Sequence, residues 1–191
     1  MTRVLLFLVS CVFTQNFVFA RLLGTSALFD DDRRIETAIG LGLATTVVMA
    51  LASALCWAID RFALQAMNAG YLRVLVYAVV SLAATFAVGL ALKAVFPAVG
   101  EALSEAGMMI AANCAALGVA LINVEAGYGI ADAVLHGLFG GLGFLLAITL
   151  MAGIHERIRY SHIPEPMKGL PITLISASLM ALAFMGFMGI G

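Results

Sequence analysis

The sequence contains very little charge. Only 11% of its 191 residues are Asp, Glu, Lys or Arg, whereas 63% are apolar and the mean hydropathy is +1.10. A soluble domain typically has about 25% charged and about 45–50% apolar residues, so these charges are too few to cover a surface that faces water. The chain is therefore identified as an integral membrane protein.

Other shortages exclude further classes of protein. Ten basic and eleven acidic residues give a net charge of −1, which lacks the basic excess needed to bind nucleic acid. The three cysteines, Cys11, Cys56 and Cys114, lie in apolar runs without CxxC spacing, so neither a disulfide framework nor a zinc knuckle is supported. No glycine-rich fingerprint joins a strand to a helix, so we expect no nicotinamide site on this chain.

Charged residues divide the sequence into six apolar segments, each long enough to cross a bilayer with roughly 20 residues. The segments are Val4 to Phe29, Thr37 to Ile59, Val74 to Leu92, Glu105 to Glu125, Ala133 to Ile154 and Gly169 to Gly191. None shows the alternation of a β-barrel strand, so all six are predicted to be membrane-spanning helices. We expect the first to be retained and not cleaved as a signal peptide, because five further spans follow.

Basic residues indicate the orientation. Six of them follow spans one, three and five, and three lie on the opposite side. Cytoplasmic loops carry the excess of Lys and Arg, so both termini are predicted outside and Arg33 and Arg157 in the cytoplasm.

Three spans on each side of a linker near Pro97 predict two inverted three-helix repeats, residues 1–96 and 97–191. Weak internal echoes support the pairing, since Asn16 precedes Gly24 in span one and Asn113 precedes Gly118 in span four. Inverted repeats place their sites at interrupted helices near the midplane, so spans one and four are predicted to be interrupted around Gly24 and Gly118. The alternative is that these glycines, and those in 40–42 and 137–143, only permit close helix packing, and that both asparagines form interhelical hydrogen bonds.

Two residues inside the spans also have two interpretations. Arg21 either snorkels to the membrane surface or stabilises an anionic centre near Ser26. A cysteine in an apolar run usually packs as a small hydrophobe, which we expect of Cys11 and Cys56. Cys114 differs because it lies in the span predicted to be broken, but a single thiolate holds no cluster alone.

Three stretches closely resemble one family of membrane subunits. They are residues 35–46, 112–121 and 178–187, and the similarity continues through the basic loop 153–169. The chain is thereby identified as a member of the RnfA/NqrE family, found in the ion-translocating ferredoxin:NAD oxidoreductase (Rnf) and the sodium-translocating NADH:quinone reductase (Nqr). The match over Glu36 to Thr46 favours an Rnf-type complex.

The resemblance implies a six-helix subunit paired with a homologous RnfE/NqrD-type partner of opposite topology. In the family, each of these two subunits contributes two cysteines to a shared intramembrane [2Fe–2S] cluster. Cys114 falls on one family position, close to Asn113 and Gly118. The second position, in a Leu-Gly-x-Cys stretch, is occupied here by Ser26, two residues after Gly24.

The serine weakens the expected cluster site, because iron–sulfur clusters are held by soft thiolates. Cys11 cannot replace it on one continuous helix, since fifteen residues correspond to roughly 22 Å along the axis. Cys56 lies on another helix. Three possibilities stay open: three thiolates with Ser26 or another ligand hold the cluster, the cluster is absent, or Ser26 is an engineered change.

The implied function is that of an electron-transfer subunit in a bacterial or archaeal cell membrane, surrounded by lipids. It would couple ferredoxin:NAD electron flow to Na⁺ or H⁺ translocation, with flavin and further iron–sulfur centres on other Rnf subunits, and would not be catalytic alone. The alternatives are a stand-alone inverted-repeat transporter, with Gly24 and Gly118 lining the substrate site, and a cluster-free scaffold subunit.

Overall fold

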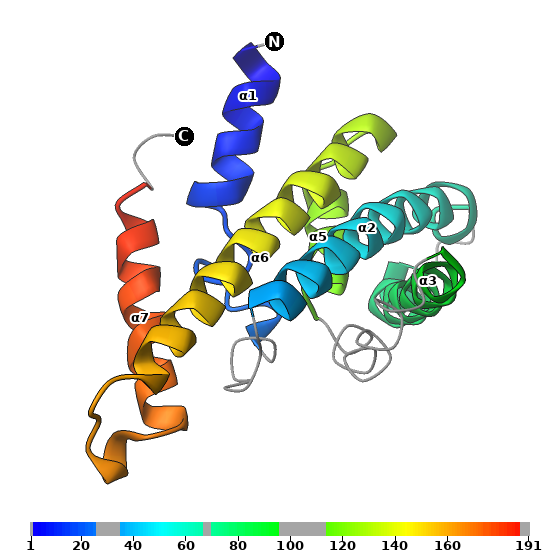
Figure 1. Ribbon diagram of the computed structural model, residues 1–191. Coiled ribbons are helices and arrows are strands. Elements are labelled where there is room, and N and C mark those ends of the chain that lie inside the picture. The colour runs from blue at the N-terminus through cyan, green and yellow to red at the C-terminus, as the bar shows by residue number, and fades with distance from the viewer. Residues whose placement is uncertain (1, 26–34, 67–69, 96–113, 188–191) are drawn as a thin grey trace.

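The computed structural model describes residues 2–25, 35–66, 70–95 and 114–187, and within these ranges every regular element is a helix (Figure 1). The elements are α1 (Thr2–Val9), η1 (Ser10–Thr14), α2 (Ile35–Ile59), η3 (Asp60–Leu64), η4 (Gly70–Leu72), α3 (Arg73–Val95), α5 (Cys114–Glu125), α6 (Ile130–Arg159), η5 (Glu165–Met167) and α7 (Leu170–Met185). The all-α prediction is confirmed.

Three stretches are long and apolar enough to cross a membrane. They are Ile35–Leu64, Gly70–Ala91 and Ile130–Arg159, with mean hydropathies of 2.0, 2.3 and 2.0. The shorter apolar helices α5 and α7 coincide with the predicted fourth and sixth spans. The chain is thus a multi-pass membrane protein, as its composition indicates.

Apolar side chains also cover the outside of the molecule. On α3, Leu75, Phe86 and Leu90 are 63%, 64% and 68% exposed, and on α7 Leu179 and Leu182 are 60% and 63% exposed. Water would not stabilise such surfaces, whereas lipid tails are as apolar as leucine. The exposed faces of α3 and α7 are therefore suited to a hydrocarbon environment.

Helices α2 and α6 form an antiparallel pair at the centre of the fold (Figure 1). Glycines allow their backbones to approach: a Cβ atom on Gly42 would lie 2.9 Å from the Leu145 Cα, and one on Gly141 would lie 2.6 Å from the Thr46 Cα. A Cβ on Gly137 would lie 2.8 Å from the Met49 carbonyl oxygen. Small residues are the usual means of close helix contact in membranes, so the packing interpretation of these glycines is confirmed.

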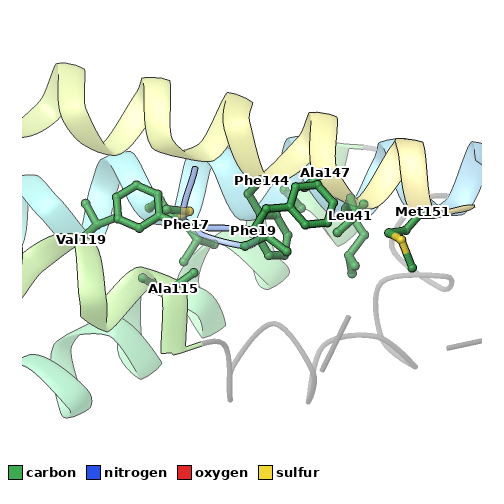
Figure 2. Close-up of a cluster of buried hydrophobic side chains, with 14 of the residues drawn as sticks. Phe17, Phe19, Leu41, Ala115, Val119, Phe144, Ala147 and Met151 are labelled. Carbon is green, nitrogen blue, oxygen red and sulfur yellow. The ribbon is translucent and has the colours of Figure 1, made fainter. Parts of the chain in front are cut away.

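The main core lies between α2, α5 and α6, and it receives two aromatic side chains from the first span. Figure 2 shows Phe17 and Phe19 among side chains of these three helices. The two rings are only 1% and 6% exposed. The labelled neighbours are Leu41, Ala115, Val119, Phe144, Ala147 and Met151. Phe17 and Phe19 therefore anchor the segment after α1 in the core.

An ion pair closes the connection between α2 and α3. The Arg73 Nε donates to the Asp60 Oδ1 at 2.8 Å, and the Gln65 Nε2 donates to the other carboxylate oxygen at 2.9 Å. The Asp60 side chain is only 4% exposed, so these donors compensate for the loss of water around the carboxylate.

Candidate cofactor site at the broken first span

The helix of the first span ends early. Following α1, the π-helical turn η1 ends at Thr14, where the Gln15 N–H donates to the Ser10 carbonyl at 2.7 Å. Residues 15–25 then form turns and no α-helix. The backbone around Gly24 is therefore irregular, as predicted, and the irregular part begins at Gln15.

Asn16 causes the chain to leave the helix. Its Oδ1 accepts hydrogen bonds from the N–H groups of Val18 and Phe19 at 2.9 and 3.2 Å. Its Nδ2 donates to the carbonyls of Val12 and Gly143, both at 2.9 Å. Asparagine side chains compete with helical hydrogen bonds in this way, and here the amide uses both donors and both acceptor positions.

The segment then turns back on itself through three backbone hydrogen bonds. These join Ala20 N–H to Asn16 O, Leu22 N–H to Val18 O and Leu23 N–H to Phe17 O, at 2.9, 3.1 and 2.8 Å. Leu22 has a φ of +55° and Gly24 a φ of +73°. Positive φ is costly for leucine, by about 1–3 kcal/mol, and such strain persists only where the surroundings impose it.

This turn brings Gly24 to Cys114. The Gly24 N–H donates to the Cys114 sulfur at 3.1 Å, although the two residues are 90 positions apart. Cys114 is exposed and lies in α5. The sulfur therefore has a backbone N–H donor from a distant part of the chain beside it.

The predicted break at Gly118 is wrong. Helix α5 continues from Cys114 to Glu125 without interruption. Glycine at position 118 serves close packing, since a Cβ atom there would lie 2.5 Å from the Leu23 Cδ1. Gly118 therefore packs the irregular segment against α5. Ser26 and Asn113 lie outside the described residues.

The other predicted residues fall into two groups. Arg21 is exposed on the irregular segment, three residues before Gly24. Cys11 and Cys56 are 2% and 1% exposed, and both are free cysteines in packed surroundings. They are confirmed as small buried hydrophobes and take no part in the site.

The donor set at Cys114 fits one part of a shared cofactor site. Cys114 is exposed and has an N–H donor beside its sulfur, and the described residues contain no group of three His, Cys, Asp or Glu side chains able to hold a metal. A cluster needs several thiolates. This arrangement is suitable only if other ligands come from the remaining residues or from a second protein.

Sequence reasoning missed a buried polar pair between α5 and α6. The His136 Nδ1 lies 2.6 Å from the Asn123 Oδ1, and the Asn123 Nδ2 donates to the Ala133 carbonyl at 3.3 Å. Because the amide nitrogen is used in this way, the Nδ1 of His136 carries the proton. His136 was visible as a single polar residue in an apolar span, but nothing in the sequence identified Asn123 as its partner.

Comparisons with known proteins agree over the whole length. Residues 4–191 match the family described as "Rnf-Nqr subunit, membrane protein". The chain is 40% identical over 182 residues to one subunit of the Na(+)-translocating ferredoxin:NAD(+) oxidoreductase complex of Acetobacterium woodii, covering 95% of each protein. It is 39% and 38% identical over 190 residues to the corresponding subunits of the ion-translocating oxidoreductase complexes of Edwardsiella ictaluri and Azoarcus sp. strain BH72, covering 100% of this chain and 98% of each relative. The chain therefore belongs to the Rnf-Nqr family of membrane subunits.

Proposed function

We propose that this chain is the RnfA-type membrane component of an Rnf complex that couples ferredoxin:NAD electron flow to Na⁺ or H⁺ translocation. The family membership and the near-complete coverage of the relatives from such complexes support this role. The single observation that carries the electron-transfer part is the exposed Cys114, whose sulfur accepts the Gly24 N–H at 3.1 Å.

Cys114 would hold one iron of a [2Fe–2S] cluster, with Ser26 at the family's second position. When bound, such a cluster supplies one-electron transfer. The residues of this chain supply the electrostatics: the Gly24 N–H donates a hydrogen bond to the sulfur. Arg21 adds a positive charge on the same segment, and Asn113 directly precedes the ligand in the sequence.

The remaining thiolates would come from a homologous protein of the RnfE/NqrD type. Cys114 supports this because it is exposed in this chain, where a second protein can cover it. Other Rnf subunits would carry flavin and further iron–sulfur centres. Alone, the chain is not a catalyst on this proposal, since it carries no nicotinamide fingerprint.

Co-purification with the homologous partner tests the function. The pair should contain iron and acid-labile sulfide and show the EPR signal of a reduced [2Fe–2S] cluster. If the pair contained neither iron nor sulfide, the chain would be a cluster-free scaffold subunit. A chain that transports a solute alone, without flavoprotein or ferredoxin-like partners, would be a stand-alone transporter.

Ser26→Cys tests the departure from the family. The variant should bind iron more completely than the natural chain, or shift the cluster's reduction potential, because a thiolate is a softer ligand than a serine oxygen. Iron content and EPR-monitored redox titration measure both effects. Thr25→Cys is the matched control, since it adds a thiol one residue away; an equal gain there would mean that position 26 has no special role.

The proposal also includes the orientation and the repeats. Residues 1–96 and 97–191 would form two inverted halves in a prokaryotic cell membrane, with both termini outside. Alkaline phosphatase fused after Gly191 should be active and a fluorescent protein fused there dark, whereas a fusion after Arg157 should give the reverse. A fluorescent fusion at Gly191 would invert the orientation inferred from the basic loops.

A further inference from the structure

We infer that Asn16 is a positioning residue that holds the Gly24 N–H on the Cys114 sulfur and thereby sets the electronic character of that sulfur. The inference rests on the proposed cluster ligand at Cys114. Asn16 does not touch the sulfur; it acts through the irregular segment that ends at Gly24. The coupling runs from the amide to the turn and from the turn to the sulfur.

The amide of Asn16 anchors the start of the irregular segment. Asn16 is 0% exposed, and its four hydrogen bonds go to three places: the end of η1, the following turn and the Gly143 carbonyl of α6. Gly143 permits this approach, since a Cβ atom there would lie 3.4 Å from the Asn16 Nδ2 and 3.3 Å from the Val12 Cα. A side chain at position 16 without both a donor and an acceptor would leave some of these buried groups unsatisfied.

The hydrogen-bonded turn links the position of Gly24 to that of Asn16. Backbone hydrogen bonds tie Ala20, Leu22 and Leu23 back to residues 16–18, so the path from Asn16 to Gly24 has no unbonded loop in between. The positive φ of Leu22 indicates that the segment is held against a local preference. Loss of the Asn16 anchor would let Leu22 relax and carry the Gly24 N–H away from the sulfur.

The acceptor of that N–H is held by helix packing. Cys114 lies in α5, which packs against α2 and α6, with Ala115, Ala116 and Val119 in the main core. Because Asn16 is also bonded to α6, α6 is the common reference for the donor and the acceptor of the 3.1 Å contact. Hydrogen bonds to a ligand sulfur stabilise the reduced, more negative form of a cluster.

Asn16→Ala therefore tests the inference in the complex with its homologous partner. The cluster's reduction midpoint should shift to more negative potential. In the full chain carrying Cys11→Ala and Cys56→Ala, the rate at which the Cys114 sulfur reacts with a maleimide should change roughly threefold to tenfold, because the Gly24 N–H no longer lies against it. The second measurement needs no cluster.

The matched control is Asn123→Ala, which also removes a buried amide bonded to α6 but has no hydrogen bond to residues 16–25. It should lower thermal stability without moving the midpoint or the alkylation rate. Asn16→Ser, which keeps a hydroxyl acceptor for the turn, should give intermediate values and carries the test if Asn16→Ala is not recovered from membranes.

The outcomes separate the inference from the proposed function. Unchanged midpoint and alkylation rate in the Asn16 variants, or equal changes in Asn123→Ala, would overturn the positioning role. A wild-type pair without any [2Fe–2S] signal would overturn the proposed function, and the alkylation rates would still decide the role of Asn16.

Discussion

Cys114→Ala is expected to abolish the [2Fe–2S] EPR signal of the paired subunits and the ferredoxin-to-NAD electron flow of the complex. The site already has Ser26 in place of one family cysteine, so losing a further soft ligand leaves too few to hold the iron. EPR spectroscopy of the purified pair and turnover of the complex in membranes measure the two effects.

Cys11→Ala and Cys56→Ala are the matched controls, because both thiols are buried and away from the site. Each variant should keep the signal and most of the turnover, with a small loss of stability from the removed sulfur. Retention of both cluster and turnover in Cys114→Ala would make Cys114 a packing residue and the chain a scaffold.

Gly141→Leu is expected to prevent accumulation of the folded protein. A Cβ atom at this position would lie only 2.6 Å from the Thr46 Cα and 2.8 Å from its Cγ2, so a larger side chain would force α2 and α6 apart. Gly141→Ala should cost about 1–3 kcal/mol, the usual range for overpacking. Thermal unfolding in detergent and the yield from membranes measure the series.

Gly153→Ala provides the control within the same helix. A Cβ atom on Gly153 meets nothing within 4 Å, and alanine is the better helix former by roughly 0.5–1 kcal/mol. The variant should be as stable as the natural chain or slightly more so. Equal losses at Gly141 and Gly153 would mean that helix propensity, and not the contact with Thr46, controls stability.

The sequence was informative where a single physical requirement controls the outcome. The apolar runs of α2, α3 and α6 were recognisable as spans because a span must be long enough to cross the hydrocarbon core. The close helix approach at Gly137 and Gly141 was expected because small residues allow helices in membranes to pack closely. Cys114 was singled out as a candidate ligand because it is a thiol in a span predicted to be broken.

The details of the site depended on contacts between distant residues, which one sequence does not reveal. Glycine was taken as the marker of a broken helix, but span one breaks where the Asn16 amide captures backbone N–H groups. Gly118 is a packing residue inside α5 because Leu23 occupies the space beside it. Likewise, the Asn123–His136 pair arises from how two helices face one another.

The hydrogen bond from Asn16 to Gly143 has a consequence for biosynthesis. The donor lies in the first span and its acceptor is 127 residues later, in α6. A nascent chain inserts its first span long before the ribosome has made α6, so the amide has no such acceptor during most of translation. The turn that carries Gly24 is therefore completed late, once the fifth span has entered the bilayer, and the proposed cluster ligand at Cys114 would acquire its Gly24 donor only after that event.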